Sequence, residues 1–346
     1  MSKIWAHEGF CVENNTVWFV PFCGGFLCEY NLARSELISV NVLCDDICKI
    51  DRYINTIKLK NKVFTVPSYT DFVCVYDVKN EKTYKYELID RGVGNHYVAI
   101  GNEEEALVFP FNSSSMIRIH ISSDIPQFEE IKVDINGFVS GIKYNDSIYL
   151  IKKDSGIYQY IDGNIMRISC VDGDTKFIDM AEMGCDKKLL LLDESGSFYI
   201  FAPDDNKIVK LSVTNNTYYS MTLRGEFIYA FPKKTGDYFD KYEIKTMTLI
   251  ERYEVNSREK NDEWAWDAYS KVQLHNDKIY VMNIMHQCLM EINEDDTINY
   301  YSIDYPDFGM DVKLASIKSQ KEKGVIKENA VTGIDLKLFI SALNDL

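Results

Sequence analysis

Residues 17–31 and 63–77 have closely similar sequences, VWFVPFCGGFLCEYN and VFTVPSYTDFVCVYD, with proline, cysteine and tyrosine at matching positions. A sequence that repeats at a regular spacing restricts the chain to architectures in which similar units pack against their neighbours. Five further copies follow, among them ALVFPFNSSSMIRIH, SIYLIKKDSGIYQYID and IYVMNIMHQCLMEIN. One hydrophobic anchor can be aligned in every copy: Val17, Val63, Ala106, Ile148, Leu189, Ile228 and Ile279.

The spacing of these anchors indicates the kind of repeat. Successive anchors are 46, 43, 42, 41, 39 and 51 residues apart, close to the period of roughly 40–50 residues found in β-propeller blades. Short runs rich in β-branched and aromatic residues alternate with Asn, Asp and Gly turns, as is typical of strands. A four-stranded unit cannot bury both faces by itself, so seven units must stack around an axis. We therefore predict an all-β fold, a seven-bladed β-propeller of four-stranded antiparallel blades.

A family resemblance supports this prediction. A strand followed by a proline-containing loop and a Tyr-Asp strand, as in VPSYTDFVCVYD, resembles propellers with YVTN-type and virginiamycin-lyase-like repeats. The resemblance covers about residues 5–303. The chain lacks a recurrent Gly-His and Trp-Asp pattern and has a glycine pair only at Gly24–Gly25, so it departs from WD40 and kelch repeats. The resemblance implies the architecture, and no family's catalytic residues can be transferred.

The repeat also predicts the domain organisation. We expect residues 1–303 to form the propeller and residues 304–346 to form a carboxy-terminal extension. A short amphipathic helix is expected in this extension, where apolar residues recur at helical spacing: Leu336, Phe339, Ile340 and Leu343. It could dock on the propeller, which we favour, or bind a partner. The closure of the ring between the first and last blades is not specified, although residues 1–6 could supply an extra strand.

The charge of the chain bears on its partners. The chain has 53 acidic and 38 basic residues, a formal net charge of −15. Nucleic acids and anionic membranes are bound through excess Lys and Arg, so we expect neither as a partner. The amino terminus, MSKIWAHEGF, has no apolar run of signal-peptide length. We therefore expect a cytoplasmic protein whose nine cysteines are reduced thiols.

A ligand is expected on one face of the ring. In a propeller, the loops between second and third strands and those between blades surround the central channel, and such loops carry binding sites. The binding candidates on these loops are aromatic, basic or histidine residues: Trp264, Trp266, Trp5, His286, Tyr69, Tyr53, Arg52 and Arg91. Other residues expected on this face include Cys23, Tyr97, Asn112, Lys153, Asp193, Tyr219 and Lys233.

The stretch NDEWAWDAY at residues 261–269 is the most informative of these loops. Two tryptophans flanked by acids could stack on a sugar ring, an aromatic side chain or a cation. Alternating tryptophans are equally what a strand that enters the channel would contain, with one ring packed on each side.

Catalytic candidates lie near the same loops. His7, His96, Asp51 and Asp267 would be the first residues to consider for acid–base chemistry. No pair of histidines has the i, i+4 or His-x-His spacing of a metal site. The cysteines lack the Cys-x2-Cys spacing of a zinc site. We therefore predict neither a metal nor a cofactor.

Two functions are compatible with this pattern. The first is a non-catalytic binding or scaffold propeller that recognises a protein, a peptide or a glycan through its loop face. The second is a lyase or hydrolase with His and carboxylate residues at the channel mouth. Propellers support both classes, so the fold does not decide between them. The lack of a local catalytic motif favours binding; the ligand and the oligomeric state are not specified.

Overall fold

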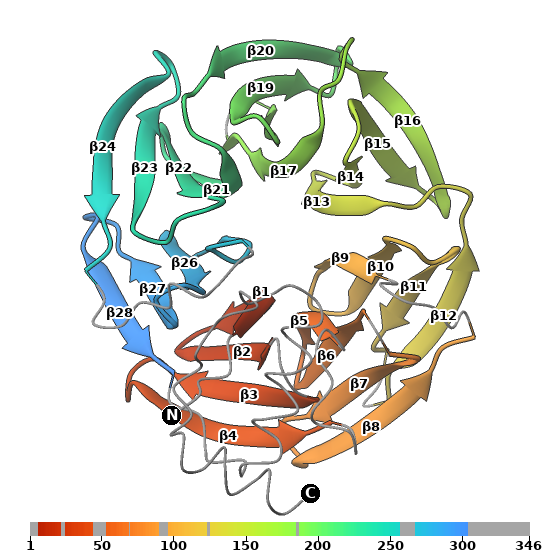
Figure 1. The fold of residues 1–346 in the computed structure, drawn as a ribbon. Coiled ribbons are helices and arrows are strands. Elements are labelled where there is room, and N and C mark those ends of the chain that lie inside the picture. The colour runs from red at the N-terminus through yellow and green to blue at the C-terminus, as the bar shows by residue number, and fades with distance from the viewer. Residues whose placement is uncertain are drawn as a thin grey trace, which may run out of the picture.

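Seven four-stranded antiparallel sheets surround a central channel in the computed structural model of this chain (Figure 1). The structure describes residues 6–21, 25–43, 53–68, 70–89, 96–122, 125–184, 187–256 and 267–303. These ranges contain strands and turns and no α-helix, so none of them holds a helix able to cross a bilayer. The helix expected near residues 336–343 lies outside the described residues.

Each blade consists of four consecutive strands, from the innermost at the channel to the outermost at the rim (Figure 1). The first four blades are β1 (Ala6–Glu13), β2 (Thr16–Pro21), β3 (Phe26–Asn31) and β4 (Glu36–Val42); β5 (Tyr53–Leu59), β6 (Lys62–Pro67), β7 (Phe72–Asp77) and β8 (Lys82–Glu87); β9 (His96–Gly101), β10 (Glu105–Pro110), β11 (Ser115–His120) and β12 (Gln127–Lys132); and β13 (Phe138–Tyr144), β14 (Ser147–Lys152), β15 (Gly156–Ile161) and β16 (Asn164–Cys170). The last three are β17 (Phe177–Glu182), β18 (Leu189–Asp193), β19 (Ser197–Ala202) and β20 (Lys207–Val213); β21 (Tyr218–Arg224), β22 (Phe227–Pro232), β23 (Tyr238–Glu243) and β24 (Thr248–Glu254); and β25 (Gln273–His275), β26 (Lys278–Asn283), β27 (Cys288–Ile292) and β28 (Ile298–Ser302).

The seven sequence anchors occupy equivalent places in this architecture. Leu189 is the first residue of its strand, and the other six are the second residue of the second strand of their blade. Each anchor pairs with an aromatic or aliphatic residue near the end of the third strand: Tyr30, Tyr76, Ile119, Tyr160, Phe201, Tyr242 and Ile292. Six anchors are fully buried, and Ile148 is partly exposed. The predicted sevenfold repeat is confirmed.

Burial explains why the second strands read as continuous apolar runs. The sequence LLLLD of β18 is buried at every position, because the sheets of neighbouring blades cover both of its faces. The fourth strands face solvent and are polar; in β24, TLIERYE, only Tyr253 is even partly buried. Most of the apolar core lies between blades, where one sheet packs on the next. Stability of each blade therefore depends on its neighbours.

In the part of the chain that the structure describes, the first and seventh blades meet without exchanging a strand. Blade 7 contains β25 to β28 and blade 1 contains β1 to β4, and within the described ranges no strand joins the other blade's sheet. The Tyr30 hydroxyl donates to the Ser302 carbonyl at 3.1 Å, and the Gln273 amide donates to the Phe10 carbonyl. Of residues 1–6, which could have formed an extra closing strand, Ala6 begins β1 and the others lie outside the described residues.

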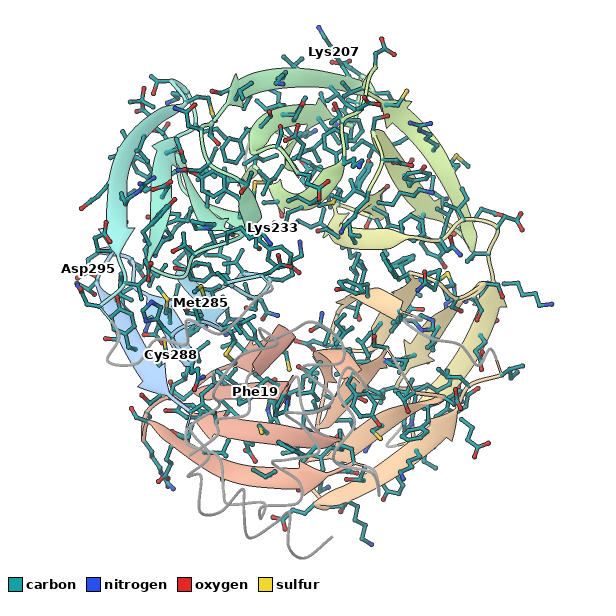
Figure 2. The ribbon with its side chains drawn as sticks, viewed as in Figure 1. Phe19, Lys207, Lys233, Met285, Cys288 and Asp295 are labelled. Carbon is teal, nitrogen blue, oxygen red and sulfur yellow. The ribbon has the colours of Figure 1, made fainter. Side chains whose placement is uncertain are left out.

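Apolar packing completes this joint. A single core cluster spans blades 1, 6 and 7 and includes Phe19, Met285 and Cys288, which Figure 2 shows in the adjoining first and seventh blades. The rings of Tyr30 and Tyr301 meet edge to face, with centroids 6.2 Å apart. Side-chain packing thus closes the ring.

Candidate functional site

The central channel forms a cavity of about 430 Å³. Its wall is built from the innermost strands of the first six blades and from the residues around β25, so every blade contributes. Small residues such as Gly9, Ala99 and Gly141 line the lumen, and a Cβ at Gly9 or Gly141 would collide with a neighbouring side chain. This volume is within the range of roughly 300–1,000 Å³ that is usual for ligand cavities.

A buried carboxylate ties four blades together at the channel wall. Asp179 of β17 is 5% exposed. It accepts hydrogen bonds from the hydroxyls of Ser140 and Ser220 and from the backbone N–H of Met221, each at 2.9 Å. The Lys271 ammonium lies 3.2 Å from its Oδ1 atom. Because the protein supplies four partners, this carboxylate acts as a structural connection between blades.

Lys271 lies where the channel opens onto the loop face. Its ammonium donates to the Ile178 carbonyl at 2.9 Å and lies 4.8 Å from the centroid of the Tyr219 ring. The side chain is 24% exposed. The position of the charge is therefore fixed, while part of the side chain still contacts solvent.

A smaller cavity of about 80 Å³ adjoins the channel at this opening, and we call it the mouth cavity. It shares three wall residues, Tyr97, Val139 and Lys271, with the channel. Its wall consists of aromatic, apolar and charged side chains: Tyr97, Phe111, Val139, Lys153, Ile178, Tyr219, Lys233, Asp267 and Lys271.

The repeat explains how these residues meet. Tyr97, Val139, Ile178 and Tyr219 are each the second residue of the innermost strand of blades 3 to 6. Three others directly follow the second strand of their blade: Phe111, Lys153 and Lys233. Equivalent positions in successive blades therefore surround the mouth.

Charges and rings are arranged together in the mouth cavity. The rings of Tyr97 and Phe111 lie with their centroids 5.1 Å apart. Lys233 lies beside the central opening (Figure 2), with its ammonium 3.6 Å from Glu194 Oε1. Its carbonyl accepts from the backbone N–H of Ala268 at 2.9 Å, which holds the segment containing Asp267 against the mouth.

The structure places only some of the candidate residues at this site. Asp267 lines the mouth cavity. His96 is buried, with Nε2 3.1 Å from the Ser115 carbonyl. Tyr53 is buried too, with its hydroxyl 3.0 Å from Cys74 Sγ. Neither His96 nor Tyr53 lines the channel or the mouth cavity.

His286 is also separated from these cavities. It is 7% exposed, and its Nε2 atom lies 3.2 Å from Asp237 Oδ1. Its backbone N–H donates to the Asn283 side chain at 2.9 Å. This histidine thus holds the turn between β26 and β27 next to the adjoining loop of blade 6.

The other candidates lie outside the described residues or side chains. His7 is part of β1, and its side chain is not among those described. Seven candidates lie wholly outside: Trp5, Asp51, Arg52, Tyr69, Arg91, Trp264 and Trp266. Their assignments stay predictions.

The sequence reasoning missed Phe111, Val139, Ile178 and Lys271 as wall residues. The first three could have been identified by extending the repeat alignment to the residues equivalent to Lys153 and Tyr97. Lys271 has no such signal, because it precedes the short strand β25 in the least regular blade. In the described ranges, no group of three or more His, Cys, Asp or Glu side chains is arranged to hold a metal ion.

Comparisons with known proteins identify the architecture. No protein-family model matches the sequence, and no curated protein matches it significantly. Virginiamycin B lyase from Staphylococcus aureus, solved as a catalytically inactive variant with quinupristin, is similar in structure, with a TM-score of 0.65 and 11% identity over 82% of this chain and 94% of that chain.

Two further structures show the same likeness. The extracellular domain of a protein described as a hybrid two-component system from B. thetaiotaomicron has a TM-score of 0.59 and 13% identity, over 87% of this chain and 38% of that one. Hsv2 from Kluyveromyces marxianus has a TM-score of 0.58 and 8% identity, over 89% of this chain and 100% of that one. At such identities the likeness shows the fold alone: a seven-bladed β-propeller.

Proposed function

We propose that this seven-bladed β-propeller is a binding module whose channel mouth recognises part of a protein, a peptide or a glycan. One observation carries the proposal: aromatic and charged side chains from four blades meet at one small cavity on the loop face. Tyr97, Phe111 and Tyr219 offer apolar ring surface, and the charged side chains around them can orient a ligand.

The described histidines support binding over catalysis. A lyase or hydrolase at the mouth needs a titratable group that reaches a substrate in the channel. The imidazoles of His96 and His286 are buried and line neither cavity. The enzyme alternative then depends on Asp267, which lines the mouth cavity, together with His7 and Asp51, whose side chains lie outside the described part of the chain.

The size of the mouth cavity favours a ligand that presents one protruding group. A volume of about 80 Å³ is well below the roughly 300 Å³ at which pockets begin to enclose a whole small molecule. A larger ligand can rest on the surrounding loops and place a single group in the mouth. This argues for a macromolecular or oligomeric ligand.

The test is a binding screen of the full chain against a peptide array and a glycan array. We expect the ligands found to bind the double variant Tyr97→Ala with Phe111→Ala at least about tenfold more weakly, since central aromatic contacts are frequent hot spots. Tyr84→Ala is the matched control, because Tyr84 is 51% exposed on the outer strand β8. Ligands that bind the double variant as tightly as the native chain would show that the mouth is not the site.

A further inference from the structure

The described wall of the mouth cavity is rich in lysine, in a chain that is strongly negative overall. Three lysines line it, Lys153, Lys233 and Lys271, and they come from blades 4, 6 and 7. Asp267 is the single acidic residue in the described wall. The net charge of the chain is −15, so a wall with three lysines and one acidic residue differs in sign from the chain as a whole. This difference requires a local explanation.

The three lysines differ in how far the protein already neutralises them. Lys271 is paired with Asp179 at 3.2 Å. Lys233 lies 3.6 Å from Glu194, whose side chain is 41% exposed. The Lys233 side chain is itself 24% exposed, and a partly exposed pair at this distance is weak, so Lys233 can exchange Glu194 for a ligand. Lys153 is exposed and forms no ion pair with any described residue.

The aromatic walls could be taken for a cage that binds a cation. Rings do attract cations, but the Lys271 ammonium already lies 4.8 Å from the centroid of the Tyr219 ring. A second cation in the same cavity would be repelled by Lys153 and Lys233 as well. The charge at the mouth therefore favours an anion.

The volume of the mouth cavity limits the kind of anion that it can hold. The mouth cavity, at about 80 Å³, is far smaller than the channel, at about 430 Å³. A carboxylate on a short stem fits this space better than a sugar ring. Lys271 is already paired with Asp179, and Asp267 lies in the same wall, so the remaining positive charge matches a carboxylate, with one negative charge, better than a phosphate ester, with nearly two. The ring pair of Tyr97 and Phe111 can pack on methylene groups behind the carboxylate.

We infer that the mouth cavity takes the carboxylate of an aspartate or glutamate side chain from an acidic peptide segment of a partner protein. Lys153 and Lys233 bind the carboxylate, and Lys271, whose charge is already paired with Asp179, lies beside them in the wall. This inference rests on the proposed function and specifies the chemistry of its ligand.

The experiment compares two acetylated decapeptides, one alternating glutamate with alanine and one alternating glutamine with alanine, by calorimetric titration of the full chain. We expect the glutamate peptide to bind at least about tenfold more tightly, because hydrogen bonds between charged groups are the stronger ones. This advantage should decrease between low and physiological ionic strength. Lys153→Gln with Lys233→Gln should abolish it.

The control double variant is Lys143→Gln with Lys207→Gln. Both lysines are exposed and line neither cavity, and Lys207 lies on the outer rim, far from Lys233 (Figure 2). This variant has the same net charge as the mouth double variant, so it removes the effect of overall charge from the comparison. It should keep the preference for glutamate.

Several results would overturn the inference. One is equal affinity for both peptides, and another is no detectable binding of the glutamate peptide. A third is a glutamate preference that survives in the mouth double variant, and a fourth is stronger binding of a uronate oligosaccharide or a phosphopeptide. If either peptide, or a neutral ligand, bound equally well to the lysine variants but lost affinity with Tyr97→Ala, the mouth would still be the binding site and only the carboxylate preference would be refuted.

Discussion

The second blade contains a buried ion pair between the start of its second strand and the end of its third. Lys62 of β6 lies opposite Asp77 of β7 in the sheet register. The ammonium is 2.7 Å from Asp77 Oδ2, and the two side chains are 3% and 5% exposed. Asp77 also accepts from the backbone N–H groups of Lys79 and Asn80, at 3.1 and 3.2 Å. The carboxylate therefore neutralises a buried cation and also holds the following turn.

These contacts set the pH dependence of the pair. Burial acts to raise the pKa of the Asp77 carboxyl, but the hydrogen bonds from Lys62 and Asn80 outweigh burial and lower the pKa from 3.8 to about 2. One pKa unit is worth about 1.36 kcal/mol, so this carboxylate contributes about 2 kcal/mol of stability at neutral pH. The contribution is present above the unfolded-state pKa. It is lost as the pH falls from about 5 to about 2.

Asp77→Asn should lower the free energy of unfolding by about 3–4 kcal/mol, because it leaves the Lys62 ammonium buried without a counter-ion. This loss exceeds the contribution of the ionised carboxylate alone. The amide oxygen of asparagine can still accept from the turn. The double variant Lys62→Met with Asp77→Asn should therefore recover most of the loss. Urea unfolding at pH 7, followed by the fluorescence of the buried Trp18, measures these differences.

The pair Arg34–Glu36 provides the control. Its side chains are 70% and 54% exposed, so Glu36→Gln should change stability by less than about 1 kcal/mol. The gap between the native chain and Asp77→Asn should narrow as the pH falls below about 5. If Asp77→Asn cost no more than Glu36→Gln, or if Lys62→Met gave no recovery, the argument from a buried unpaired charge would be refuted.

Two further expectations concern hydrogen-bonded tyrosines. Asp240 is fully buried and accepts hydrogen bonds from the Tyr218 hydroxyl at 2.6 Å and from two Arg252 nitrogens at 2.8 and 3.0 Å. Asp240→Asn should therefore lower the free energy of unfolding in urea by about 2–3 kcal/mol, and a loss below about 1 kcal/mol would contradict this. Burial and the hydrogen bond to Asp154 raise the pKa of Tyr158 to about 12. The stability that the protonated Tyr158 contributes is present below about pH 10 and is lost as the pH rises from there to about 12. The free energy of unfolding of Tyr158→Phe should therefore fall less steeply with alkaline pH than that of the native chain, and an unchanged alkaline profile would argue against this origin.

The fold could be predicted from the sequence because the same physical demand recurs in each blade. Val17 and Val63 stand at the start of a strand covered on both faces, and only apolar residues satisfy that position. Each blade has this requirement at the same position, so apolar residues recur in the sequence at a regular spacing. The partial exposure of Ile148 shows that the anchor tolerates variation where the neighbouring blade covers it less completely.

The site was less predictable, for two physical reasons. Successive strand residues point to opposite faces, and the sequence did not show that Tyr97 faces the mouth while His96 turns toward Ser115. The position of Lys271 depends on Asp179, which is 92 residues earlier in the sequence. No periodic pattern links these two residues, since their contact arises from closure of the ring.

That closure has a consequence for how the chain could be cut and rejoined. Because every sheet in the described part of the chain is made of four consecutive strands, a circular permutant that starts at β5 and ends with β4 would contain the same seven sheets, with none of the described ladders divided. A propeller whose last sheet borrows a strand from the other terminus does not have this freedom. Among the described strands, no sheet depends on where the chain begins or ends.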